Sequence, residues 1–214
     1  MSLNVKIEDW YNLHKGFQLT LEPGYTALVG PNGAGKTTIL SQLREFAKKE
    51  GIRFWEYSNL RDGGHVAANQ YMFSGNIEGF AASTTCSEGE YLAYNFANQV
   101  KAMAQAVKQA ANAKQPILVL LDAIDSGASI DRARELMGFI NKICNTETKN
   151  GVELYLVMAV NHYELAKTPA NCVNVRTGKP IHFGSYDAYA DFICSFEDRY
   201  TRLTEKKIER KKMR

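Results

Sequence analysis

The sequence lacks the patterns that mark several protein classes. No run approaches the roughly 20 apolar residues that a membrane-spanning helix needs. Residues 1–8 alternate in polarity, whereas a signal peptide has a basic start and an apolar centre. The four cysteines lie far apart without a Cys-x-x-Cys pair, which argues against a zinc site or a disulfide framework. We therefore expect a soluble, cytoplasmic protein that does not insert directly into a membrane.

Internal repeats, low-complexity segments and Pro/Gly-rich linkers are also absent. With 214 residues and 45% apolar content, the chain is long enough for one well-buried domain spanning residues 1–214. Hydrophobic patterns predict strands at 3–7, 17–21, 25–30, 52–57, 116–122, 153–160, 172–176 and 180–183. They predict helices near 37–50, 88–113, 130–145, 163–167 and 185–213. This order predicts an α/β fold with a mainly parallel sheet, helices on both faces and an antiparallel N-terminal β flank.

The most informative motif is GPNGAGKT at residues 30–37, between a predicted strand and a predicted helix. In this context it is typical of a P-loop, whose glycines let backbone N–H groups turn toward phosphates. Lys36 is placed to reach the β- and γ-phosphates, and the Thr37 hydroxyl to bind Mg²⁺. The motif predicts binding of a nucleoside triphosphate, and the expected contacts are Asn32, Gly33, Ala34, Gly35, Lys36, Thr37 and Thr38.

A buried strand pattern, ILVLLD, ends at Asp122. Ligands of parallel sheets bind at the carboxyl ends of the strands, so Asp122 is expected to reach the Mg²⁺ held by Thr37. We predict that Thr37 and Asp122 are the metal ligands.

Two further motifs point to anion binding. Ser87 and Gly89 open a long helical pattern and predict a second phosphate site, although a simple helix cap has the same spacing. His162 follows the strand predicted at 153–160 and is a candidate to face the γ-phosphate; a histidine that only caps the sheet edge is the alternative.

The order of these motifs resembles that of an ABC-type ATPase over nearly the whole chain. By this resemblance, residues 86–90 correspond to the signature, residues 126–129 to the D-loop, and His162 to the switch histidine. The resemblance implies that ATP and Mg²⁺ are the cofactors and that two copies form an ATP-dependent head-to-tail homodimer. Each site would consist of one P-loop and the other copy's signature.

The region between the P-loop and the signature is short. Lys36 and Ser87 are 51 positions apart, so we expect no large insertion and a polar, glycine-containing excursion at residues 59–80. Gln70 is a candidate for the family's Q-loop glutamine, or a surface glutamine. Tyr11 is a candidate for stacking on adenine, or a structural aromatic.

Position 123 is the main departure from the family, because alanine replaces the glutamate that usually polarises the attacking water. Asp122 and His162 remain as catalytic candidates. Three explanations stay open: Asp125 substitutes for the glutamate, the protein is a slow ATP-gated dimer, or the alanine was introduced to trap the ATP state. Tight packing of a small residue is a fourth reading.

The C-terminal tail, at about 199–214, carries eight Lys or Arg and two Glu and is predicted to be helical. It predicts contact with nucleic acid, or alternatively a solvated helix end. The sequence therefore favours an ATP-gated dimer with weak or impaired ATPase activity that acts on DNA or on a protein partner. The alternatives are the nucleotide-binding subunit of a membrane transporter and a catalytically dead ATP-dependent interaction module.

Overall fold

A computed structural model describes residues 2–9, 16–62, 64–86, 88–149, 151–167 and 171–195. The strands are β1 (Leu3–Ile7), β2 (Phe17–Leu21), β3 (Gly24–Val29), β4 (Arg53–Ser58), β5 (Ile117–Asp122), β6 (Leu154–Val160) and β7 (Cys172–Asn174). The helices are α1 (Lys36–Glu50), α2 (Asn59–Asp62), α3 (Gly64–Ser74), α4 (Ile77–Thr85), α5 (Glu88–Asn112), α6 (Ile130–Lys149), α7 (Tyr163–Ala166) and α8 (Tyr186–Cys194).

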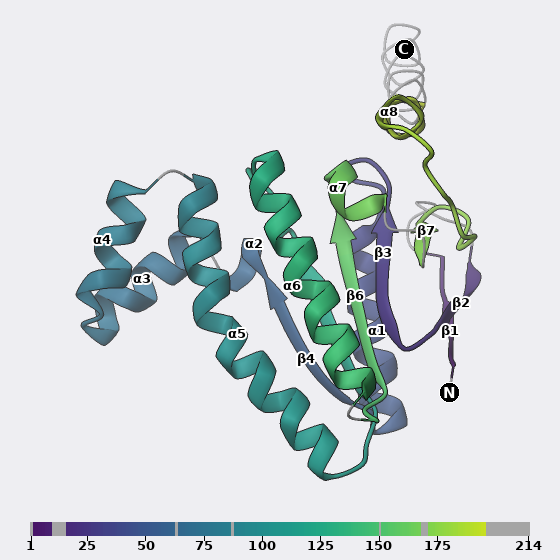
Figure 1. The fold of residues 1–214 in the computed structure, drawn as a ribbon, viewed down its shortest axis with the longest axis horizontal. Coiled ribbons are helices and arrows are strands. Elements are labelled where there is room, and N and C mark those ends of the chain that lie inside the picture. Colours follow the sequence, from purple (N-terminus) through teal and green to yellow (C-terminus); the bar gives the residue numbers. More distant parts are fainter. Residues whose placement is uncertain are drawn as a thin grey trace, which may run out of the picture.

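The central sheet has five parallel strands in the order β4-β5-β6-β3-β7 (Figure 1). β1 and β2 form a separate antiparallel pair. All residues of β5 and β6 are buried, because both faces of a parallel sheet are covered by other elements. The predicted α/β fold and its antiparallel N-terminal flank are confirmed.

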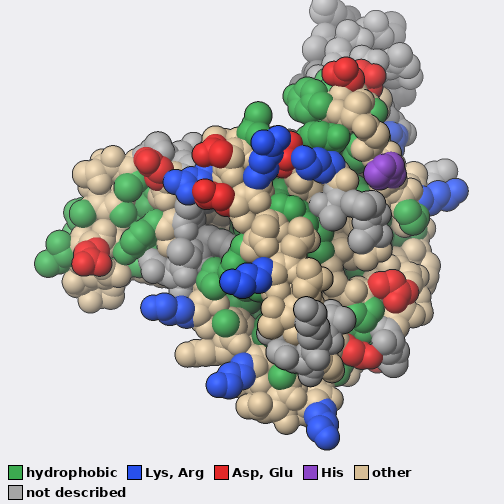
Figure 2. Space-filling model, in the orientation of Figure 1, with side chains coloured by type: hydrophobic (Ala, Val, Ile, Leu, Met, Phe, Trp, Pro, Cys, Tyr) green, Lys and Arg blue, Asp and Glu red, His purple; other side chains and the backbone are tan. Residues whose placement is uncertain are grey.

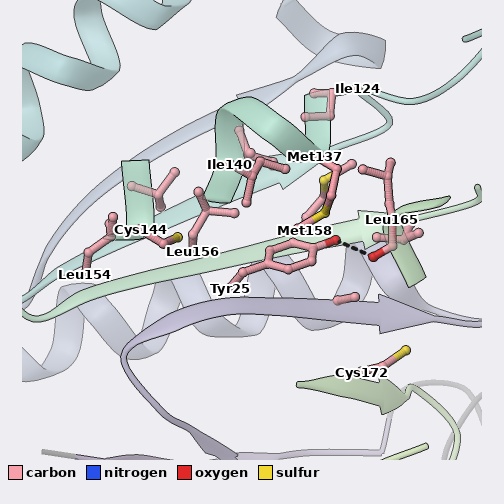
Figure 3. Packing of buried hydrophobic residues seen from close by; sticks show 14 of the residues in the cluster. Tyr25, Ile124, Met137, Ile140, Cys144, Leu154, Leu156, Met158, Leu165 and Cys172 are labelled. Atoms are coloured by element: carbon pink, nitrogen blue, oxygen red, sulfur yellow. Dashed lines mark hydrogen bonds between the residues drawn. The ribbon is translucent and has the colours of Figure 1, made fainter. Parts of the chain in front are cut away.

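Two apolar clusters pack on opposite faces of this sheet. On one face, α1 and the β1–β2 pair contribute Ile39, Leu43 and Leu19. On the other, α5 and α6 contribute Met103 and Ile140. Figure 3 shows the second cluster, in which the Tyr25 hydroxyl donates to the carbonyl oxygen of Leu165 at 3.1 Å and ties β3 to α7. Burial raises the pKa of Tyr25, so the hydroxyl keeps its proton as the donor.

The region expected to be a short polar excursion is helical instead. Helices α3 and α4 pack on each other and form a helical lobe, residues 64–85, that lies beside α5 at one end of the molecule, and α2 lies at the end of β4 (Figure 1). The Tyr71 ring packs against Gly79, where an added Cβ would approach it to 2.6 Å, and the Tyr71 hydroxyl donates to the Asn95 side chain at 2.9 Å. The Asn76 side chain caps α4 by accepting from the N–H of Gly79. The prediction for residues 59–80 was therefore wrong.

The C-terminal predictions are corrected in two places. The strand expected at 180–183 does not form, and Pro180 makes only an isolated bridge with Val173. A proline ring nitrogen has no hydrogen to donate to a neighbouring strand, which disfavours a longer ladder here. The helix expected at 185–213 is described only as α8, which Ser185 caps by accepting from the N–H of Ala188. The basic tail at 199–214 lies outside the described residues.

Candidate nucleotide-binding site

The P-loop connects the carboxyl end of β3 to the start of α1. Gly33 and Gly35 have φ angles of 78° and 96°, which side chains with a Cβ rarely adopt. Gly30 is needed for a different reason, because an added Cβ would lie 2.6 Å from the Val175 side chain. The loop thus has the backbone freedom to direct N–H groups inward, at the positive end of the α1 dipole.

Lys36 is largely buried in this loop, at 8% exposure. Its ammonium donates to the carbonyl oxygens of Gly30 at 2.5 Å and Pro31 at 3.1 Å. Burial lowers the pKa of Lys36, whereas the carboxylates of Asp125 and Asp122 raise it. The ammonium is therefore held by the backbone of the phosphate-binding loop itself.

Thr37 and Asp122 meet across the end of the sheet. The Thr37 hydroxyl donates to the two carboxylate oxygens of Asp122 at 3.1 and 3.2 Å. The hydroxyl of Ser58, at the end of β4, donates to the same carboxylate at 3.3 Å. Two hydroxyl groups, from α1 and β4, thus meet at the Asp122 carboxylate at the end of β5.

Lys36, Thr37 and Asp122 open onto a cavity of about 470 Å³. Its lining residues come from the P-loop, from the end of β5 and from the segments that follow β5 and β6. They are Asn32, Gly33, Gly35, Lys36, Thr37, Thr38, Asp122, Ala123, Ser126 and Asn161. Six of the seven predicted P-loop contacts thus line one space, and Ala34 is outside this set.

Asp125 lies beside the cavity with its carboxylate engaged. It accepts from the backbone N–H of Asn161 at 2.7 Å and of His162 at 3.0 Å, and it is 4% exposed. Burial raises the pKa of Asp125, and these hydrogen bonds oppose the rise. The carboxylate therefore fixes the loop after β6 in place, and its proposed part in catalysis stays a prediction.

His162 caps α7, with Nδ1 accepting from the N–H of Glu164 at 3.3 Å. The residue before it, Asn161, lines the cavity, whereas His162 is not among the lining residues. The assignment of His162 to the γ-phosphate stays a prediction.

Ala123 lines the cavity directly after Asp122 and has a φ of 54°. This left-handed backbone is uncommon for a residue with a Cβ and marks a tight bend at the end of β5. At 7% exposure, the methyl group offers the cavity no polar atom.

The other predicted site residues are spread apart. Gln70 is exposed on α3 in the helical lobe, and Gly89 lies in the first turn of α5. Ser87 and Tyr11 lie outside the described residues. Gln70 is absent from the residues that line the cavity, and its Q-loop assignment stays a prediction.

Sequence reasoning missed Ser58 and Asn161 as site residues, and it assigned Ser126 to the D-loop without predicting that it lines the cavity. The signal for Ser58 was its place at the end of an edge strand, since all such ends meet at one edge of a parallel sheet. Asn161 and Ser126 are the sequence neighbours of His162 and Asp125, which the sequence had indicated as catalytic candidates.

The fold and the cavity define a P-loop ATPase. A family model described as "AAA domain" matches residues 4–45. A second model, described as "ATPase family associated with various cellular activities (AAA)", matches residues 26–184. The chain belongs to this family, and it is an ATP-binding P-loop ATPase.

The resemblance to ABC-type ATPases is also supported. A protein of Fusarium pseudograminearum (strain CS3096) named "ABC transporter" is 44% identical over 57 residues. The match covers 25% of this chain and 4% of that protein. Within the described part of the present chain, no helix combines the length and the apolar character needed to cross a bilayer.

Proposed function

We propose that the chain is a cytoplasmic ATP-gated switch, in which two copies bind Mg²⁺-ATP, associate head to tail and hydrolyse ATP slowly. The observation that carries this proposal is the composition of one cavity. Lys36, Thr37 and Asp122 supply binding groups there, and Ala123 stands where a water-polarising carboxylate is usual. The cavity thus has binding groups, and the side chain at position 123 supplies no carboxylate to polarise water.

The side chains at the end of the sheet fit a magnesium ion. The Thr37 hydroxyl and the Asp122 carboxylate are hard oxygen donors, and the Ser58 hydroxyl is close by. The described residues contain no cluster of three His, Cys, Asp or Glu side chains, so phosphate oxygens and water would complete the coordination. A bound Mg²⁺ would neutralise charge on the β- and γ-phosphates.

Charge also supports dimerisation. Among the described residues that line the cavity, Lys36 is the one cation. When Mg²⁺ and Lys36 bind a triphosphate, part of its negative charge remains, and a further positively polarised group would stabilise it. The N-terminus of α5 in a second copy, with Ser87 and Gly89, is our candidate, because a helix N-terminus favours anions.

Static light scattering with and without Mg²⁺-ATP tests this proposal. The unmodified protein should dimerise only with ATP. Ser87→Arg should bind ATP but remain monomeric, because a bulky side chain would occupy the phosphate-docking position. Thr84→Arg is the matched control, since Thr84 is exposed at the end of α4. An unchanged ATP-dependent dimer in Ser87→Arg would contradict the proposal.

A nucleotide-binding subunit of a membrane transporter is the second candidate. It is favoured by an apolar tip on the helical lobe, formed by Met72, Phe73, Ile77 and Phe80, with Phe73 and Ile77 exposed at 87% and 82%. Figure 2 shows apolar side chains gathered over this lobe. Large exposed apolar side chains that lie together mark interaction sites.

Co-purification from detergent-solubilised membranes tests this second candidate. A defined set of membrane proteins should be retained by the unmodified chain and lost with Phe73→Ser combined with Ile77→Ser. Ile130→Ser is the control, because Ile130 is also exposed, at 57%, but lies at the start of α6. Equal retention by all three proteins would exclude the lobe as the contact.

Two further readings have their own tests. A DNA partner is supported by the positive charge of residues 199–214, and it requires salt-sensitive duplex binding that is lost when residues 206–214 are removed. A catalytically dead interaction module requires ATP-dependent association with no turnover in either the unmodified protein or Ala123→Glu.

A further inference from the structure

Helix α8 contributes one buried side chain to the molecule. The helix lies at the rim of the structure, on the side where the chain continues to the C-terminus (Figure 1). The structure describes all residues of α8, and Tyr189 alone among them is buried, at 6% exposure. Tyr186, at the start of the same helix, is 63% exposed. The contacts of Tyr189 therefore largely decide where α8 lies.

The ring of Tyr189 packs against two other aromatic rings. The centroids of the Phe183 and Tyr189 rings are 5.2 Å apart and the ring planes are 88° apart, which is the edge-to-face arrangement that aromatic pairs favour. The ring of Tyr163, on α7, lies 5.7 Å from that of Tyr189. These contacts involve the ring and leave the hydroxyl group for another partner.

That partner is the backbone of the segment that follows β6. The Tyr189 hydroxyl donates to the carbonyl oxygen of Asn161 at 2.8 Å, which is the usual length of such a bond. Burial raises the pKa of Tyr189, and the negative charge of Asp125 raises it further. The hydroxyl therefore keeps its proton and remains a donor.

Asn161 is thus held by two different parts of the chain. Its backbone N–H donates to the Asp125 carboxylate at 2.7 Å, and its side-chain amide donates to the same carboxylate at 3.3 Å. Its carbonyl oxygen accepts from Tyr189. Because Asn161 also lines the nucleotide cavity, both contacts help to determine where it lies in that cavity.

We propose that Tyr189 is a positioning residue of the nucleotide site, which holds Asn161 at the cavity and couples the docking of α8 to ATP binding. Coupling between two binding equilibria is reciprocal, so ATP should in turn hold α8 more firmly. The proposal rests on ATP binding in this cavity and requires neither dimerisation nor turnover.

The chain contains a matched control for this hydrogen bond. Tyr25 is 7% exposed, and its hydroxyl donates to the backbone carbonyl of Leu165 at 3.1 Å (Figure 3). Burial and the charge of Asp125 raise the pKa of Tyr25 as well. Leu165 is not among the residues that line the cavity. Tyr25→Phe and Tyr189→Phe each remove one buried donor to a backbone carbonyl, and only Tyr189→Phe releases a cavity residue.

Calorimetric titration with ATP and thermal unfolding, applied to the full chain and to both variants, test the proposal. Each variant should lower the melting temperature by about 2 to 4 °C, because each loses one hydrogen bond. Tyr189→Phe should also weaken ATP binding about three- to tenfold, whereas Tyr25→Phe should bind ATP as the unmodified chain does. A purely structural role of Tyr189 would give the two variants the same ATP affinity.

Amide hydrogen exchange tests the reciprocal effect, and its main measurement needs no variant. Saturating Mg²⁺-ATP should slow exchange in α8 of the unmodified chain and of Tyr25→Phe, and should have less effect on α8 in Tyr189→Phe. Equal ATP affinity of the two variants, or exchange in α8 of the unmodified chain that ATP leaves unchanged, would overturn the proposal. An unmodified chain that binds no ATP would overturn it together with the proposed function.

Discussion

The carboxylate of Asp125 accepts the backbone N–H of Asn161 at 2.7 Å and so joins the segment after β5 to the segment after β6. Both segments border the nucleotide cavity, and Ser126 and Asn161 line it. A buried acceptor with two backbone donors specifies the distance between these segments more tightly than apolar packing does.

Asp125→Asn is expected to destabilise the fold by about 1 to 3 kcal/mol, because an amide has one oxygen for the two backbone N–H donors and would set its NH₂ group against the Asn161 side-chain amide, which now donates to Asp125 Oδ1. Thermal unfolding measures this. Because burial raises the pKa of Asp125 above its unfolded value, the native state binds the proton more tightly. The contribution of this group to stability is therefore full below the unfolded pKa and falls as pH rises through the folded pKa. A pH-independent difference between variant and parent would contradict this assignment.

Lys36→Ala should reduce ATP affinity at least about 100-fold, because it removes the one cation that the described part of the cavity provides. Calorimetric titration with ATP measures the effect. Lys48→Ala is the matched control, since Lys48 is on the same helix, half-exposed and paired with Glu45. Unchanged affinity in a folded Lys36→Ala protein would refute the role of Lys36.

Ser58→Ala should weaken binding of Mg²⁺-ATP about three- to tenfold and leave metal-free ATP binding unchanged. The reason is that the Ser58 hydroxyl bonds Asp122, the residue expected to hold the metal. Ser74→Ala is the control, because its hydroxyl bonds only within the exposed part of the lobe. Equal losses with and without Mg²⁺ would assign Ser58 a purely structural role.

Ala123→Glu should raise ATP turnover by about 10²- to 10⁴-fold, the usual range for a positioned general base. Ala123→Gln supplies a side chain of the same size without the charge and should turn over ATP as slowly as the parent. Phosphate release under saturating Mg²⁺-ATP is the measurement. Rapid turnover by the parent that Asp125→Asn removes would identify Asp125 as the base instead.

Glu164 provides a prediction about acid stability. Hydrogen bonds from Arg134 and Lys167 lower the pKa of Glu164 to about 2. The folded value lies below the unfolded one, so the stabilisation is present above the unfolded pKa and is lost as pH falls toward 2. Glu164→Gln should cost about 1 to 3 kcal/mol at neutral pH and little at pH 2, as measured by denaturant unfolding.

Glu135→Gln is the control for this last prediction, because Glu135 pairs with Arg132 while 65% exposed. Surface pairs of this kind contribute less than about 1 kcal/mol. If both variants lowered the free energy of unfolding by the same amount, the burial of Glu164 would not strengthen its ion pairs.

The strands of the central sheet were predictable because β5 and β6 are continuous apolar runs of a length typical of buried strands. The helical lobe was not, because α3 and α4 leave several apolar residues on the surface and so lack the one-sided pattern of a helix on a core. Asn76 was an available signal, since asparagine is a common helix cap.

The part of the site that was predictable consists of residues that belong to motifs continuous in the sequence. The P-loop residues and Asp122 are recognised by their spacing, and they line one cavity. Asn161 reaches that cavity because β6 lies beside β3, and Ser58 reaches Asp122 because β4 lies beside β5. Single-sequence patterns do not specify strand order, so these two contributions required the structure.

The position of β3 between β6 and β7 has a consequence for biosynthesis. The strand that leads into the P-loop emerges from the ribosome before both of its hydrogen-bonded neighbours, which lie more than 100 residues later in the chain. Vectorial folding therefore cannot complete the sheet around β3 until residue 174 has been synthesised. A nascent chain that stops before β6 would carry the P-loop sequence on a strand without its two neighbours in the sheet, and nucleotide binding should begin only after β7 has been synthesised.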